Sequence, residues 1–375
     1  MPQPIPGRIP RTGKLVLVLL FLAALAGAVP LLRMGNEEPV LIGAILPLSG
    51  PASHLIDLRD AIDLAVEELN RWGGLNGREI RIVIEDSRSD PGEAVEAFAR
   101  IEAAHHPLFY ITANSNVAMA LAPLAAERQV VLLGLVVSAP EFSRQNEWTY
   151  RYYTSAEYEV DTLLSLLGKQ RITRLGVLYQ DEPYGSSVYR LLAREFAATG
   201  GRVTGAPFPA GAADLTPQIT ALQGEEAIFV VGFTSNILTG LAQARQAGFD
   251  GTLFAASGLT SPEYRGRPEA DGVYVNAPLI YSDTFPFAQK AREQYEKHFH
   301  RPLGHQAACG YDAVQMLAGL LTGEELSRAG VKNLLDRGFT YPGVFGQLDL
   351  QAGSRDLLFP LHPARIEAGE LRYLR

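Results

Sequence analysis

The sequence predicts an α/β fold of two lobes, each built on a parallel sheet. A β-α-β unit opens the body of the chain: an apolar run at Val40–Ile45, an apolar stripe at helical spacing from Leu58 to Leu69, and an alternating run at Ile80–Ile84. Strand-like and helix-like segments then alternate in two series, separated by a loop at 147–159. The 375 residues, 47% of them hydrophobic, are enough to bury two ordinary cores.

The remaining elements follow from the same two periodicities. Gly73 ends the first helix, because glycine takes the left-handed conformation without a Cβ penalty. The first series continues with a strand at 108–111, a helix at 117–127 and an apolar run at 130–137. The second series is predicted to contain a helix at 160–167, a strand at 175–179, a helix at 187–198, a strand at 227–231 and a helix at 237–247. The last part of the chain is predicted to contain a strand near 272–282, helices at 285–299 and 307–321, and the segment "GVFGQLDL". The sequence does not decide which of the two lobes this part joins.

Residues 1–36 have the pattern of an export segment. Basic residues precede the apolar run Leu15–Val29, and small residues at Ala26–Ala28 are suitable for signal peptidase. A retained membrane anchor is the alternative, because Leu31 and Leu32 extend the run. In both interpretations the rest of the chain is exported across a membrane. In both, this segment is also the only part expected to contact the membrane.

Composition excludes several classes of function. The formal net charge of −8 argues against nucleic acid as a partner. The single cysteine, Cys309, excludes an intramolecular disulfide and a C-x-x-C site. The histidines in "HFHRPLGH" lack metal-ligand spacing, so no metal or cofactor is expected. Without a nucleophile elbow, a P-loop or a zinc-helix motif, the chain is not expected to be an enzyme.

Three loops between a strand and a helix are candidate binding loops, because open parallel sheets bind ligands beyond the carboxyl ends of their strands. Ser115 and Ser138 each follow a strand of the first lobe, where a hydroxyl and backbone N–H groups can hold an anion. A role as helix caps is the alternative for both serines and is compatible with binding. Tyr184 follows a strand of the second lobe and either faces the cleft or packs on its own lobe.

Four segments in order resemble one known family: "IGAILPLSGPA", "AVEELNRWGGLNGREIRIVIEDSRSDPGEA", "YQDEPYGSSV" and "CGYDAVQMLAG". From about Val40 to its end, the chain is similar to the leucine/isoleucine/valine-binding protein family. These are type I periplasmic binding proteins, which deliver amino acids and amides to ABC transporters. The resemblance implies two Rossmann-like lobes with a cleft between them, joined by three hinge strands. We expect 37–156 plus 280–340 in lobe 1 and 157–279 plus 341–375 in lobe 2.

The resemblance also implies a set of binding residues. In the first lobe, the serine for a ligand carboxylate matches Ser115, and the hydroxyl residue of the next loop matches Ser138, with the Val137 backbone beside it. In the second lobe, the cleft tyrosine matches Tyr184. The remaining matches are an acid after the crossover, an aromatic residue at a strand end and a position before a glycine, which fall on Glu157, Phe233 and Ser257.

Ser257 departs from the family pattern. Amino-acid binders commonly carry an acid at this position, and its loss removes a partner for the ligand ammonium. The first loop departs as well, so His54 or Leu55 shapes the pocket. The expected ligand is therefore an amino-acid-like molecule, an amide, a small carboxylate or an aromatic acid.

The function predicted from the sequence is that of a monomeric solute-binding protein in the periplasm or another extracytoplasmic space. It would close on its ligand about a hinge and pass the ligand to an ABC transporter permease. The alternative is a receptor held at the inner membrane by its N-terminal segment, which uses the same fold to sense the ligand.

Overall fold

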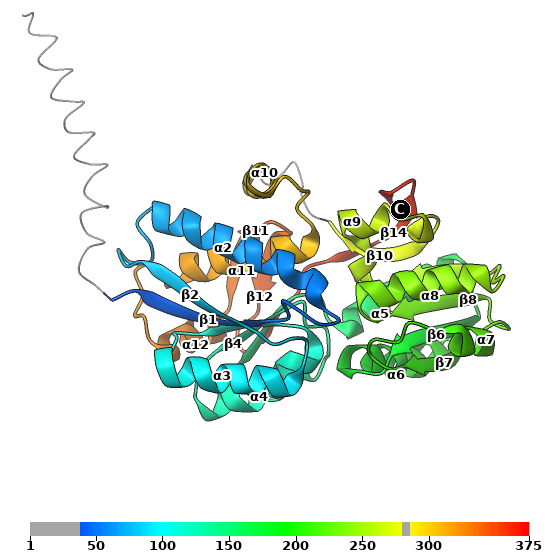
Figure 1. Cartoon of the computed structure of the whole chain (residues 1–375), viewed down its shortest axis with the longest axis horizontal. Coiled ribbons are helices and arrows are strands. Elements are labelled where there is room, and N and C mark those ends of the chain that lie inside the picture. Colours follow the sequence, from blue (N-terminus) through cyan, green and yellow to red (C-terminus); the bar gives the residue numbers. More distant parts are fainter. Residues whose placement is uncertain (1–37, 280–285, 375) are drawn as a thin grey trace, which may run out of the picture.

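The computed structural model describes residues 38–279 and 286–374, which form two α/β lobes side by side (Figure 1). None of the helices within these residues is long and apolar enough to cross a membrane. The predicted export segment lies outside the described residues.

The first lobe contains a six-stranded sheet in the order β13-β5-β4-β3-β1-β2, with every neighbouring pair parallel. Its strands are β1 (Val40–Leu46), β2 (Ile80–Asp86), β3 (Tyr110–Ala113), β4 (Leu132–Leu135), β5 (Thr149–Tyr152) and β13 (Asp356–Leu357). Its helices are α2 (Ile56–Arg71), α3 (Pro91–His105), α4 (Ser115–Glu127), α10 (Pro286–Phe299), α11 (His305–Leu321) and α12 (Arg328–Asp336).

Alternation along the strands gives this sheet two buried faces. Ile42, Ala44 and Leu46 of β1 pack in a core with α2 and α11. Ile45, which points to the opposite face, packs in a second core with α3 and α4. Figure 1 shows α2 and α11 on one side of the sheet and α3 and α4 on the other. The buried sheet explains why the strands are apolar runs.

The predicted glycine turn connects α2 to β2. Gly73, Gly74 and Gly77 all have positive φ, from 70° to 105°. A Cβ on Gly74 would lie 1.9 Å from the Arg78 carbonyl oxygen, so the turn requires glycine there. The turn lies away from the carboxyl ends of the strands, in agreement with a scaffold role.

The second lobe contains a seven-stranded sheet in the order β15-β14-β10-β9-β8-β6-β7. Its strands are β6 (Arg174–Gln180), β7 (Arg202–Phe208), β8 (Ala227–Val231), β9 (Thr252–Ala255), β10 (Tyr274–Pro278), β14 (Leu361–Glu367) and β15 (Glu370–Tyr373). The last two pair antiparallel, and the others are parallel. Its helices are α5 (Ala156–Lys169), α6 (Pro183–Ala198), α7 (Thr216–Ala221), α8 (Thr234–Gln246) and α9 (Pro262–Arg265).

The C-terminal part of the chain divides later than the sequence suggested. The hairpin of β11 (Phe339–Gly343) and β12 (Gly346–Leu350) packs in the α2/α11 core of the first lobe, and β13 joins the first sheet. The chain returns to the second lobe only with β14. The expected boundary at residue 341 is therefore too early, because Val344, Phe345 and Leu348 bury their side chains in the first lobe.

Candidate functional site

A cavity of about 550 Å³, part of it open to solvent, lies between the lobes at the carboxyl ends of their parallel strands. From the first lobe it is lined by His54, Leu55, Asn114, Ser115, Val136, Ser138, Tyr153 and Gln306. From the second it is lined by Glu182, Tyr184, Gly232, Phe233, Thr234, Ala256, Ser257 and Gly258. The structure therefore brings together five residues expected from the sequence: Ser115, Ser138, Tyr184, Phe233 and Ser257. It also brings His54 and Leu55 to the cavity.

Ser115 is oriented by the neighbouring loop. Its Oγ accepts hydrogen bonds from the backbone N–H groups of Ser138 (3.2 Å) and Ala139 (3.3 Å). Both acceptor positions are thereby used, and the hydroxyl hydrogen can be donated into the cavity. Ser115 is also the first residue of α4, where the helix dipole favours an anion. The first-lobe wall can thus hold a carboxylate without a cationic side chain.

Arg151, on β5, fixes the loop that follows β4. It is 1% exposed, and its guanidinium donates to the carbonyls of Ser138 (3.2 Å), Ala139 (2.9 Å) and Pro140 (3.3 Å). Its Nε lies 3.0 Å from Asp356 Oδ1 on the neighbouring strand β13. Burial lowers the pKa of Arg151 from its ordinary value. The loop carrying Ser138 therefore depends on a buried cation behind it.

Val137, whose backbone the resemblance placed beside Ser138, is not among the residues that line the cavity. Its side chain is fully buried in the α3/α4 core. The preceding residue, Val136, lines the cavity with φ of 53°, a strained conformation for a β-branched residue. This turn at the end of β4 changes which of the two valines faces the cleft, and strand alternation alone does not predict it.

In the second lobe, a buried carboxylate organises two lining residues. Glu159 is 1% exposed; its Oε2 accepts from the Tyr184 hydroxyl (2.5 Å) and its Oε1 from the Ser257 N–H (3.2 Å). Burial raises the pKa of Glu159. The Tyr184 ring and the Ser257 backbone are thus held by an acid that the sequence analysis did not select.

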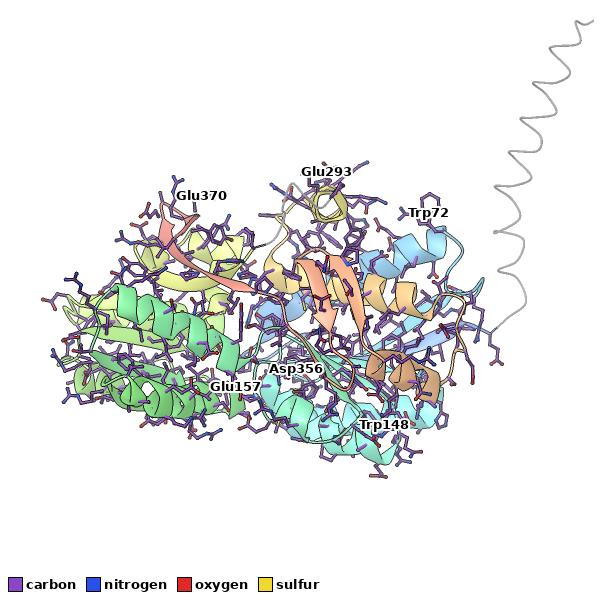
Figure 2. The ribbon with its side chains drawn as sticks, turned by 180° about the vertical axis from the view of Figure 1, so that it is seen from behind. Trp72, Trp148, Glu157, Glu293, Asp356 and Glu370 are labelled. Atoms are coloured by element: carbon purple, nitrogen blue, oxygen red, sulfur yellow. The ribbon has the colours of Figure 1, made fainter. Side chains whose placement is uncertain are left out.

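Glu157, the acid that the resemblance selected, lies outside the cavity. Glu159 lies two positions further along α5, a rotation of about 200° around the helix. The Glu157 carboxylate binds Arg144 Nη2 at 2.8 Å, with both side chains more than a third exposed. Figure 2 shows Glu157 where the two lobes meet.

Side chains of the two lobes contact each other at the cavity and elsewhere. The His54 ring lies 6.4 Å from the Phe233 ring and 6.2 Å from the Tyr264 ring, between centroids. Elsewhere, Glu141 accepts from Arg190 and from Ser187, both at 3.2 Å. The ion pair is exposed and contributes less than about 1 kcal/mol. These contacts show that the two lobes approach each other across the cleft.

His305 is a neutral imidazole that links Tyr153 to Thr260, and Thr260 in turn bonds Ser257. The Thr260 hydroxyl donates to the Ser257 carbonyl at 2.7 Å, so it accepts from His305 Nδ1–H at 3.3 Å. His305 Nε2 then accepts from the Tyr153 hydroxyl at 3.1 Å. Burial, followed by the proximity of His54, lowers the pKa of His305 to about 3.

This histidine predicts a specific pH dependence of stability. Unfolded His305 takes up a proton below about pH 6.5, whereas the folded protein does not until about pH 3. Its contribution to stability is therefore lost as the pH falls from 6.5. Between pH 8 and pH 5, the wild type should lose about 2 kcal/mol more unfolding free energy than H305Q. Urea titrations measure this difference. H298Q, at an exposed histidine, is the control, and parallel curves for wild type and H305Q would contradict the assignment.

Sequence reasoning missed several polar lining residues, among them Asn114 and Glu182. Each is the N-cap of a helix beside the cavity: Asn114 Oδ1 accepts from Asn116 N–H at 3.3 Å, and Glu182 Oε1 accepts from Gly185 N–H at 3.0 Å. Both stand in the loops selected from the sequence, so their cap position was the available signal. No cluster of three or more potential metal ligands occurs within residues 38–279 and 286–374.

Comparison with known sequences gives a consistent picture. A family model described as a periplasmic binding protein matches residues 39–370. The substrate-binding protein BasB of a chemotactic signal transduction system in Halobacterium salinarum is 39% identical over 107 residues, 28% of this chain and 26% of that protein. A Leu/Ile/Val-binding protein homolog 7 from Brucella suis is 26% identical over 274 residues, 69% of this chain and 67% of that protein. The match thus spans about a quarter of the first relative and about two thirds of the second.

Solved structures share the fold. The leucine-binding protein LivK of Thermotoga maritima superimposes with a TM-score of 0.82 at 23% identity, over 90% of this chain and 98% of that chain. LivJ of Streptococcus pneumoniae, in complex with isoleucine, gives 0.80 at 19% identity, over 90% and 99%. A solute-binding protein of Rhodopseudomonas palustris, in complex with 3,4-dihydroxybenzoic acid, gives 0.78 at 17% identity, over 90% and 96%. These likenesses confirm the two-lobed fold predicted from the sequence.

Proposed function

Because the chain belongs to the periplasmic binding protein family, we propose that it captures a small amino-acid-like, amide or carboxylate ligand and delivers it to an ABC transporter. Family membership implies an extracytoplasmic location. One observation carries the proposal: the interlobe cavity has neutral hydroxyl donors on one wall and aromatic rings with an acid on the other. Relatives of the same fold crystallised with isoleucine and with 3,4-dihydroxybenzoic acid support a ligand of this size.

The ligand is proposed to bridge the two lobes. Ser115 and Ser138 donate to its anionic or carbonyl group, while Tyr184, Phe233 and Ser257 contact it from the second lobe. A ligand with partners on both walls binds the closed arrangement more tightly than an open one, so it shifts the population toward closure. Glu157, paired with Arg144, contributes to contact between the lobes instead of to the ligand.

The test is a thermal-shift screen of residues 37–375 against amino acids, amides, small carboxylates and aromatic acids, followed by calorimetry. A ligand that binds only the folded protein raises its melting temperature. A screen in which no compound raises the melting temperature would contradict the proposal.

Ser138 allows a sharp test of the anion-binding wall. Its hydroxyl has no hydrogen-bond partner among the described residues, so S138A should weaken binding of a carboxylate ligand about tenfold or more without a loss of stability. S115A should weaken binding similarly, but should also lower the unfolding free energy by about 1–3 kcal/mol, because the N–H groups of Ser138 and Ala139 lose their acceptor. S235A, at an exposed serine near the cavity, is the control. Unchanged affinity of S138A would exclude this serine from the site.

Delivery needs a separate test in the source organism. Deletion of the protein should abolish uptake of the labelled ligand identified in the screen. Normal uptake combined with loss of a response to that ligand would instead indicate the sensing alternative.

A further inference from the structure

Trp72, directly after α2, is more exposed than any other large apolar side chain among the described residues. It is 82% exposed, whereas the other exposed side chains of this kind reach 43% at most. Leaving tryptophan in water is unfavourable, because its ring carries a large apolar area. The neighbouring Leu75, which is 3% exposed, already fills the α2/α11 core at this point. The Trp72 ring is therefore free to contact a partner outside the lobe.

The turn that carries Trp72 is fixed by its polar side chains. Asn70 exchanges two hydrogen bonds of 2.8 Å with the backbone of Ile80, which ties the end of α2 to the start of β2. Asn76 Oδ1 accepts from Gly323 N–H at 2.7 Å, which ties the turn to the segment after α11. The exposure of Trp72 is thus part of the fold and does not come from a loose end of chain.

This turn lies at the end of the first lobe that is directed away from the second lobe. Figure 2 shows Trp72 at that end, and Figure 1 shows β1 beginning there. Arg78, on the same turn, donates from Nε to the Glu38 carbonyl at 2.7 Å, and Val40 N–H donates to the Glu79 carbonyl at 2.7 Å. These bonds fix the turn beside the residues that lead into β1.

The sequence before β1 limits the distance between this end of the lobe and a membrane. The apolar run of the N-terminal segment extends to Leu32, and the seven residues 33–39 separate it from Val40. A fully extended chain of this length spans at most about 28 Å. When the apolar run is retained as an anchor, the Trp72 end of the first lobe is held within reach of the bilayer. The cleft lies at the other end of the strands.

The side chains at this end are suited to the interfacial layer of a bilayer. An indole ring prefers the boundary between hydrocarbon and water, where its apolar face is covered and its N–H stays hydrated. Arg71 is exposed as well, and arginine can extend its charge to lipid headgroups. The exposed Glu38 and Glu324 oppose adsorption to anionic lipid, so the contact depends on the ring and not on net charge.

We propose that, in the membrane-anchored protein, Trp72 inserts into the interfacial layer of the bilayer and sets the first lobe end-on, with the cleft directed to the solvent. This contact adds to the one expected of the N-terminal segment. It goes beyond the proposed function and does not depend on which ligand the cleft holds.

The test uses the full-length chain in vesicles of phosphatidylcholine, with or without bromine atoms on the lipid chains near the headgroups. Bromine quenches tryptophan emission at short range. The chain has two tryptophans, and Trp148 is only 9% exposed, so emission lost in brominated vesicles reports on Trp72. The wild type should lose roughly half or more of the Trp72 emission, because the ring lies at headgroup level. W72F should lose none.

W72F/E370W is the matched control. The Glu370 side chain is 69% exposed and lies on the second lobe, away from Trp72 (Figure 2). A tryptophan at this position should emit without quenching by the brominated lipid. Equal quenching of the wild type and this control would overturn the proposal, because vesicle contact would then not be specific to the Trp72 end.

Three further results would overturn the proposal. Unquenched emission at the wavelength of a hydrated ring would show that Trp72 stays in water. Unquenched but blue-shifted emission would show that another occupant covers the ring, either residues 1–36 or a second copy of the chain. A mature N-terminus near Val29, found by mass spectrometry of the exported protein, would leave no anchor. None of these results bears on the solute-binding role.

Discussion

Replacement of Arg151 by methionine is expected to lower the unfolding free energy by about 3–5 kcal/mol, because it removes a buried cation and leaves its partners unpaired. The carbonyls of Ser138, Ala139 and Pro140 lose their donor, and Asp356 loses its ion pair. The same loop carries the N–H groups that orient Ser115, so ligand affinity should fall as well. Chemical denaturation and calorimetry measure the two effects.

R144M is the matched control for this substitution. Arg144 lies in the same region, but its side chain is 61% exposed and pairs with the exposed Glu157. Its removal should change the unfolding free energy by less than about 1 kcal/mol. R151K should give an intermediate loss, since an ammonium group cannot replace the fork of donors. A loss below about 1 kcal/mol for R151M would refute the idea that this arginine supports the loop.

Substitution of Asp312 by alanine is expected to cost about 3 kcal/mol or more of unfolding free energy. The carboxylate is fully buried and accepts from the hydroxyls of Tyr152 and Tyr341 (2.6 Å to the latter) and from Val344 N–H (2.8 Å). Two buried donors, the Tyr152 hydroxyl and Val344 N–H, lose their acceptor in D312A at about 1–3 kcal/mol each, and the partly buried Tyr341 hydroxyl loses its acceptor as well. Tyr152 lies on β5, so the same change loosens the strand that leads into the second lobe.

The pH dependence distinguishes this role from simple loss of packing. Burial raises the pKa of Asp312 to about 6, so its contribution to stability is largest below its ordinary pKa and falls as the pH rises through 6. The penalty for D312A should therefore be larger at pH 5 than at pH 8. D349A, at an exposed acid of β12 that accepts from Thr340, should show a small penalty that does not follow this trend. A D312A penalty that does not change with pH would contradict the burial argument.

The sequence located most elements and the loops of the site, because both depend on local patterns. The helix stripe and alternating run predicted α2 and β2, and the strand at 227–231 matches β8. Ser115, Ser138 and Tyr184 were found because each follows a strand and precedes or begins a helix. The strands β5, β7 and β9 were missed: β5 lies in the segment 147–159 predicted as a loop, β7 contains Gly205 and Pro207, and β9 is only four residues long.

The tertiary structure decided which side chains reach the cavity. The sequence pattern does not distinguish Glu157 from Glu159, because both are acids in the same segment. In the folded helix, Glu159 lies behind Tyr184 and Glu157 lies at the exterior. Glu182 and Asn114 are helix caps in the folded protein, and only the tertiary structure shows that both line the cavity.

The sequence by itself thus determined the two α/β lobes and the edge of each sheet where a ligand would bind, since periodicity and strand-loop-helix order are written in neighbouring residues. The tertiary structure alone decided that β11, β12 and β13 join the first lobe, that Arg151 supports the Ser138 loop, and that Glu182 supplies the acid of the cavity. These features depend on contacts between residues far apart in the chain, for which local patterns carry no information.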